Sequence, residues 1–89
     1  MIKFTRHAQQ KFRILKVHDF QISKKKVIEV INNPEEIDYS RSPLLIAQDK
    51  IDTEHVLRVV YKEQNGDKIV ITFYPGRIKQ YAKKDKTKN

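Results

Sequence analysis

Apolar residues follow a helical period in the first third of the chain and a strand-like period after it. Residues 6–16 place Ala8, Phe12 and Leu15 at spacings of four and three, which puts these side chains on one side of a helix. Residues 24–32 carry four apolar side chains within five positions. A proline two residues later ends this segment, because proline disfavours helical geometry in the residue before it. The pattern therefore predicts two amphipathic helices in the N-terminal part.

The residues around these segments support the assignment. Thr5 and Ser23 stand immediately before the two helices, and each hydroxyl can accept a hydrogen bond from an early backbone N–H. After the second helix, short apolar runs separated by polar residues predict strands. Pro75-Gly76 is expected to break the ladder of the last long strand, because proline has no N–H to donate. The predicted strands are residues 1–4, 37–39, 44–50, 56–61, 68–74 and 78–81.

The sharpest local signal is Asn65-Gly66, which lies between two apolar runs and predicts a β-hairpin with a two-residue turn. In a regular hairpin, Arg58 lies on the face opposite to Tyr74. A bulge would shift the register by one residue and exchange the faces, so the sequence leaves open whether Arg58 and Thr72 point the same way. The regular register pairs Tyr61 with Val70, Val59 with Thr72, and Leu57 with Tyr74.

The order of these segments predicts the fold class. A strand, two helices and then an antiparallel meander indicate an α+β protein. Eighty-nine residues suffice for one domain with one modest core. We assign residues 1–82 to this domain. Residues 83–89 are rich in Lys and can bury little, so they are predicted to form a basic flexible tail.

The charge of the chain is large and unevenly distributed. The formal net charge is +8. Residues 1–26 carry eight Lys or Arg against one Asp, residues 27–76 carry five against nine acidic residues, and residues 77–89 carry six against one Asp. Such a field favours nucleic acid or an acidic protein as partner. A high Lys content also serves solubility, so charge alone does not decide the function.

Other features of the sequence limit the kinds of covalent link, metal site and membrane contact that the protein can have. The chain has no cysteine, which excludes disulfides and thiolate metal sites. No apolar run approaches the roughly 18 residues that a membrane span needs, and the N-terminus lacks the apolar core of a signal peptide. We therefore expect a cytoplasmic protein that does not contact a membrane.

Arginines and one histidine are the residues best suited to phosphate chemistry. Arg58 stands inside an apolar strand, where an unpaired charge is costly, so it is either exposed or functional. Arg58, Arg77 and Arg6 offer fixed planar donors to phosphoryl oxygens. His7 is the candidate that titrates near neutrality, and Lys11 lies on the same edge of the helix. A surface histidine without a role explains His7 equally simply.

Aromatic residues near the basic ones suit single-stranded nucleic acid. Tyr74 and Tyr81 can stack on bases or donate to phosphate. Packing at the sheet margin is an alternative explanation for Tyr74, and strand propensity is one for Thr72. The chain has only two glycines and no glycine-rich phosphate loop. The acidic residues before His55 are interpreted as a solvated loop without metal-ligand spacing, so we expect no cofactor, and any hydrolysis should be metal-free.

A resemblance to known proteins rests on five short stretches: residues 4–8 (FTRHA), 22–23 (IS), 27–34 (VIEVINNP), 57–61 (LRVVY) and 69–75 (IVITFYP). They resemble a family of small bacterial proteins that are mostly described as domains of unknown function. The layout of that family is similar to the BrnT toxins and, more remotely, to the RelE/ParE superfamily of toxin–antitoxin ribonucleases. The resemblance covers nearly the whole chain.

The resemblance implies a compact toxin fold, with two N-terminal helices packed on a twisted antiparallel sheet of about four strands. It also implies metal-independent cleavage of RNA, free or on the ribosome, and an acidic antitoxin protein as partner. By position, the family's histidine at the helix start falls on His7 and its strand arginine on Arg58. The residues that close the hairpin and follow it fall on Thr72, Tyr74, Arg77 and Tyr81.

The leading hypothesis is therefore a toxin-like endoribonuclease, in which the RNA 2′-hydroxyl attacks the neighbouring phosphate. His7 would be the general acid or base, while Arg58 and Arg77 would hold the phosphate and stabilise its developing charge. Two alternatives stay open: a non-catalytic nucleic-acid-binding module, and a domain that docks an acidic protein. The predicted substrate-binding residues are Arg6, Lys11, Thr72, Tyr74 and Tyr81.

Overall fold

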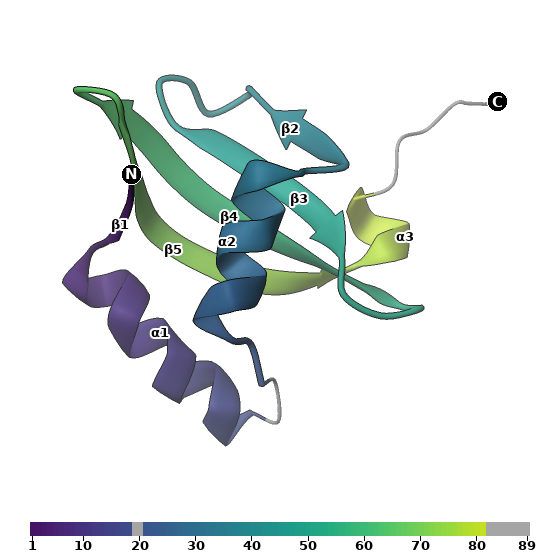
Figure 1. Cartoon of the computed structure of the whole chain (residues 1–89). Helices are drawn as coiled ribbons and strands as arrows, with labels where there is room; N and C mark the ends of the chain where they lie inside the picture. The colour runs from purple at the N-terminus through teal and green to yellow at the C-terminus, as the bar shows by residue number, and fades with distance from the viewer. Residues whose placement is uncertain (19–20, 82–89) are drawn as a thin grey trace, which may run out of the picture.

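The computed structural model describes residues 1–18 and 21–81, which form a sheet with helices on one side (Figure 1). The predicted tail at residues 83–89 lies outside the described residues. The elements in chain order are β1 (Ile2–Phe4), α1 (Arg6–Val17), α2 (Lys24–Asn32), β2 (Glu36–Asp38), β3 (Leu45–Lys50), β4 (His55–Gln64), β5 (Asp67–Arg77) and α3 (Ile78–Tyr81).

The sheet has five strands in the order β1-β5-β4-β3-β2. Strands β2 to β5 pair antiparallel, as the meander predicted, whereas β1 pairs parallel to β5. The α+β class is therefore confirmed, but the sheet is mixed, and it has five strands where the resemblance implies about four. The two edge strands, β1 and β2, lie close to the segments predicted at residues 1–4 and 37–39, and each has three residues.

Helices α1 and α2 cover one face of the sheet (Figure 1). Helix α1 lies against β5, and α2 lies against β3 and β4. Both N-terminal caps form as predicted: the Thr5 hydroxyl accepts from the Ala8 N–H at 3.1 Å, and the Ser23 hydroxyl accepts from the Lys26 N–H at 3.0 Å. The core between the helices and the sheet contains Ala8, Leu15, Val27, Val30, Ile31, Ala47, Leu57, Val59, Tyr61, Val70 and Phe73.

The hairpin between β4 and β5 departs from the regular register. Asn65 and Gly66 have φ values of 54° and 82°, as a tight two-residue turn with two left-handed residues requires. Tyr61 pairs with Val70 as predicted, but Ile71 has no partner, and the register shifts there. The predicted pairs of Val59 with Thr72 and Leu57 with Tyr74 are wrong, because this bulge moves β5 by one residue. Val59 pairs instead with Phe73, Leu57 with Pro75, and Arg58 with Tyr74.

The end of β5 also differs from expectation. The strand continues through Pro75 and Gly76 to Arg77 instead of breaking at Pro75. Strand β1 pairs only with residues 68–70 of β5, so β5 is an edge strand beyond that point, where proline is tolerated. The segment Ile78–Tyr81 is the short helix α3, not a strand, and the Ile78 N–H donates to the Glu54 carbonyl at 2.9 Å. No helix in the described part of the chain is long and apolar enough to cross a bilayer.

Candidate functional site

The face of the sheet that α1 and α2 leave uncovered carries a cluster of polar side chains around Arg58. Leu57 and Val59 of β4 belong to the core, so Arg58 between them points to the opposite face. Gln48 of β3 and Tyr74 of β5 are its direct neighbours across the two ladders. We call this side of the sheet the open face.

Arg58 makes hydrogen bonds with three residues on three other strands. Its Nη2 donates to Asp38 Oδ2 at 2.9 Å, its Nε donates to the Tyr74 hydroxyl at 3.2 Å, and its Nη1 donates to Gln48 Oε1. Only 7% of Arg58 is exposed to solvent, and Gln48 is 5% exposed. A buried guanidinium needs this pairing, since removing its charge partner leaves an uncompensated buried charge.

The charges of this cluster are stabilised by their surroundings. Hydrogen bonds from Ser40 are the main reason that the pKa of Asp38 falls from 3.8 to about 2, and Arg58 lowers it further. The Ser40 backbone N–H donates to Asp38 Oδ1 at 2.8 Å. Burial opposes the charge of Arg58, but its contacts with Tyr74 and Asp38 outweigh burial and raise the pKa of Arg58. At neutral pH, Asp38 and Arg58 therefore form an ionised pair. Arg58 is also hydrogen-bonded to the Tyr74 phenol and the Gln48 amide.

A hollow of about 470 Å³ opens above this cluster, within the size range of small-ligand sites. Its lining combines polar residues, among them Arg58, Tyr74 and Ser40, with aliphatic ones. Arg41 is exposed at its margin and can reach a bound anion. The hollow is lined by Asp38, Ser40, Arg41, Leu44, Ile46, Arg58, Val60 and Tyr74.

Three of the predicted site residues share the open face. Thr72 is half-buried and pairs with Val60, which lines the hollow, so Arg58, Thr72 and Tyr74 point the same way. The bulge in β5 settles this point, which the sequence left open. Arg77 lies at the end of β5, opposite His55, and its side chain is exposed outside the hollow.

The other predicted site residues do not join this cluster. Arg6 and His7 are exposed in the first turn of α1, and Lys11 is half-buried on the same helix. Because α1 packs on the covered face, the sheet separates His7 from Arg58. Tyr81 is the last residue of α3, and its side chain lies outside the described residues.

Four residues of the open face were not predicted: Asp38, Ser40, Arg41 and Gln48. Gln48 could have been predicted from the sequence. It lies inside the apolar run of residues 44–50, and a buried amide needs a hydrogen-bond partner, just as Arg58 does. Asp38 could not have been predicted, because nothing in the local sequence shows that residues 36–38 lie two strands away from Arg58 in the sheet.

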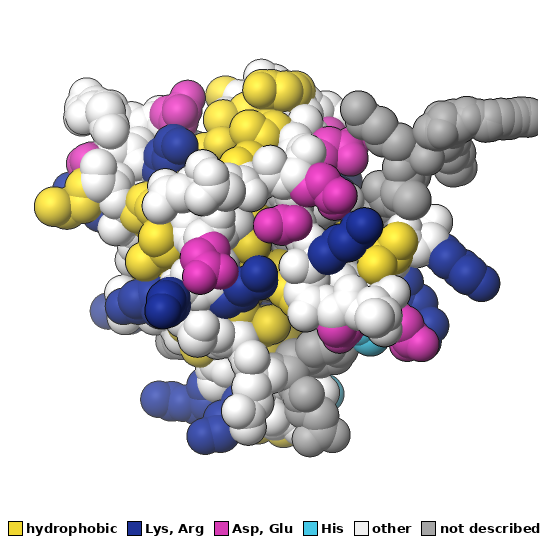
Figure 2. Space-filling model, turned by 45° about the vertical axis from the view of Figure 1, so that its right-hand side comes forward, with side chains coloured by type: hydrophobic (Ala, Val, Ile, Leu, Met, Phe, Trp, Pro, Cys, Tyr) yellow, Lys and Arg dark blue, Asp and Glu magenta, His cyan; other side chains and the backbone are white. Residues whose placement is uncertain are grey.

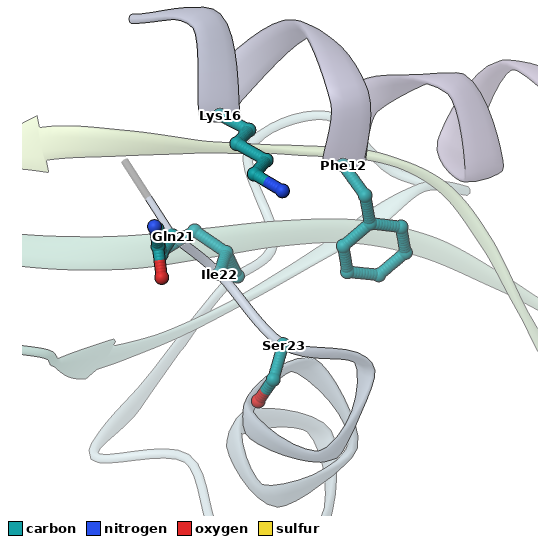
Figure 3. Close-up of a pocket in the computed structure, with 5 residues that line it drawn as sticks. All are labelled: Phe12, Lys16, Gln21, Ile22 and Ser23. Carbon is teal, nitrogen blue, oxygen red and sulfur yellow. The ribbon is translucent and has the colours of Figure 1, made fainter. Parts of the chain in front are cut away.

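A second hollow, of about 310 Å³, lies between the end of α1 and the start of α2. Figure 3 shows Phe12 and Lys16 reaching from α1 into this space, across from Ile22 and Ser23. Its lining is mostly apolar, and Lys16 is the charged residue in it. The open face gathers more convergent polar groups and is the better candidate for the functional site.

The remaining candidate cluster is a surface loop. His55 Nδ1 lies 3.0 Å from Asp52 Oδ1, and the Glu54 and His55 backbone N–H groups donate to the same oxygen at 2.7 Å. Within residues 1–18 and 21–81, no three His, Cys, Asp or Glu side chains are grouped so that they could hold a metal ion.

In comparisons with known proteins, no protein-family model, curated protein or solved structure matches the chain. A functional assignment therefore depends on the site itself.

Proposed function

We propose that the protein is a toxin-like, metal-independent endoribonuclease of the RelE/BrnT type, with its active site on the open face. The observation that carries this proposal is the buried Arg58 in the lining of a hollow of about 470 Å³. Burying a guanidinium under an open hollow is costly, and a charged group in a cleft whose pKa is perturbed by burial and a charge partner is a candidate functional residue.

Arg58 and Arg41 bind the scissile phosphate in this proposal and stabilise the charge that develops on its oxygens. The Tyr74 hydroxyl accepts from Arg58 Nε at 3.2 Å, so its own proton remains available for donation. When the 2′-hydroxyl attacks phosphorus, its proton passes to water, and Tyr74 donates to the leaving 5′-oxygen. The products are a 2′,3′-cyclic phosphate and a 5′-hydroxyl end.

The acid–base roles differ from those that the resemblance implied. His7 lies across the sheet from Arg58, so it takes no part in this mechanism. Asp38 is a poor general base, because its pKa of about 2 lies far below the pH of the cytoplasm. Electrostatic stabilisation by the arginines is therefore the main catalytic contribution, and we expect modest rates.

A non-catalytic RNA-binding module is the second candidate. It is favoured by a specific observation: among the described residues that line the hollow, none is a histidine. Such a module would bind phosphate through the same arginines and release the RNA intact. An acidic antitoxin remains a proposed partner under either function, since the net charge of +8 favours it.

The test is incubation of purified protein with total RNA and with isolated ribosomes carrying messenger RNA, in buffer containing EDTA. Variants Arg58→Gln, Tyr74→Phe and His7→Ala are compared with the wild type, and circular dichroism checks that each is folded. We expect discrete products from the wild type and from His7→Ala, and a loss of at least about 10²-fold in rate for the other two. Loss of cleavage in His7→Ala alone would place the site on α1. Intact RNA throughout would favour the binding module.

A further inference from the structure

Helices α1 and α2 carry a group of exposed cations, whereas Arg58 is buried. Helix α1 contains no acidic residue, and the first three residues of α2 are all Lys. We define the basic helix surface by its exposed members: Arg6, Arg13, Lys16, Lys24 and Lys25.

Among the described residues, the cations of the basic helix surface make no ion pair, unlike several other cations in the molecule. Lys3, Lys26 and Lys50 each lie within 4.0 Å of a carboxylate oxygen. Within the described residues, no member of the basic helix surface makes such an ion pair; Lys24 lies over the Phe4 ring, 5.1 Å from its centroid. Their charge is therefore available to a partner.

The members of this surface also lie together. Arg6, Arg13 and Lys16 follow one side of α1 at spacings of seven and three residues, which spans about 15 Å along the helix. Lys16 lines the same hollow as Ser23, the cap residue of α2 (Figure 3). Lys24 and Lys25 follow Ser23 in the chain, so they begin α2 beside this end of α1. Figure 2 shows Lys and Arg side chains without acidic neighbours at the lower left of the visible face, at the height where Figure 1 places α1 and the start of α2.

We propose that the basic helix surface binds the phosphate backbone of single-stranded RNA, separately from the hollow around Arg58. This inference rests on the proposed function in naming RNA. Cations spaced along α1 and the start of α2, without ion pairs among the described residues, suit a strand that carries one charge per nucleotide. Strand β5 connects the two sites, because α1 packs along it while Thr72 and Tyr74 stand on its open face.

The basic helix surface and the open face would then have different roles in RNA binding. The basic helix surface supplies affinity without sequence preference, and the open face holds one phosphate for the reaction. RNA that crosses the β5 edge can contact both, because in the described part of the chain no strand pairs with β5 beyond Val70 on that side. Removal of cations from α1 or α2 should therefore weaken RNA binding without altering Arg58.

The test measures binding of a fluorescein-labelled 12-nucleotide 2′-O-methyl-uridine RNA by anisotropy, between 50 and 300 mM KCl. This probe has no free 2′-hydroxyl and cannot be cleaved, so failure of binding and failure of cleavage are distinguishable. The test variant is Arg13→Gln with Lys25→Gln, and the control is Lys62→Gln with Lys79→Gln. All four side chains are exposed, and both double variants lower the net charge equally.

Each lost phosphate contact should reduce the salt slope of log affinity by about 0.7, so the test variant should lose about 1.4. If the affinity extrapolated to 1 M salt is unchanged, this corresponds to about 25-fold weaker binding at 0.1 M. The control should keep the wild-type slope. Equal losses in both double variants would mean that only net charge matters and would overturn the proposal. An absence of wild-type binding at 50 mM KCl would also overturn it, and the surface would then suit an acidic protein.

Discussion

The ionised Asp38 carboxylate, held by hydrogen bonds from Ser40 and by Arg58, makes a measurable contribution to stability, and its size can be derived from the structure. A pKa of about 2 for Asp38, against 3.8 in an unstructured chain, corresponds to about 2.4 kcal/mol at 1.36 kcal/mol per unit. Because 32% of the Asp38 side chain is exposed, solvent screening reduces this to about 1 kcal/mol. Asp38→Asn keeps an acceptor for Arg58 but removes the charge. We expect it to lower the free energy of unfolding by about 1 to 2 kcal/mol at pH 7.

The pH dependence of this effect has a definite sign. A carboxylate whose pKa is lowered by folding stabilises the protein above its unfolded pKa, and this stability is lost as the pH falls through the folded value. The difference between wild type and Asp38→Asn should therefore be full above about pH 5 and should shrink between pH 4 and pH 2. Urea unfolding followed by circular dichroism across this range measures it.

A matched control separates the contacts of Asp38 with Ser40 and Arg58 from the general loss of an acidic residue. Glu36 lies on the same strand as Asp38, and among the described residues it makes no ion pair. Glu36→Gln should therefore leave stability within about 0.5 kcal/mol of the wild type. The reasoning is refuted if Asp38→Asn is as stable as the wild type at pH 7, or if its deficit is the same at pH 2.

Three further predictions address the fold and the site. Phe73→Ala should cost about 3 to 5 kcal/mol in urea unfolding, because Phe73 is fully buried and its ring centroid lies 4.6 Å from that of Phe12; a cost below about 1 kcal/mol would contradict this packing. Gly66→Ala should cost about 1 kcal/mol from its positive φ alone, because an added Cβ meets no atom within 4 Å, and a larger loss of thermal stability would indicate a hidden contact. Tyr74→Phe should change stability by less than about 1.5 kcal/mol, so that any loss of RNA cleavage reports on its hydroxyl, and unfolding of this variant would show that the hydroxyl is structural.

Local signals in the sequence predicted most of the elements. The Lys24–Asn32 helix follows from a capping serine, an apolar stripe and a terminating proline, which all lie within a dozen residues of one another. The hairpin turn follows from the left-handed preference of Asn65 and Gly66. These effects depend on neighbours in the chain, so no knowledge of the tertiary structure was needed.

Pairings between distant segments account for what the sequence did not reveal. Strand β1 joins β5 across more than sixty residues, and β2 places Asp38 beside an arginine twenty residues away. Three-residue strands have little pattern of their own, since their position is set by the longer strands that they pair with. The site residue Arg58 was therefore predictable from its unusual place in a strand, whereas its partner Asp38 was not.

The single unpaired residue in β5 explains how one hairpin serves both the core and the site. Without the bulge at Ile71, Tyr74 would point toward the helices and Phe73 toward the open face. With it, Phe73 packs against Phe12 in the core, while Tyr74 accepts from Arg58 on the other side. Bulges occur often beside functional sites because they redirect a side chain without ending a strand. Removal of this irregularity should therefore disrupt the core and the Arg58 cluster together, since a one-residue slip exchanges the faces of every residue from Thr72 onward.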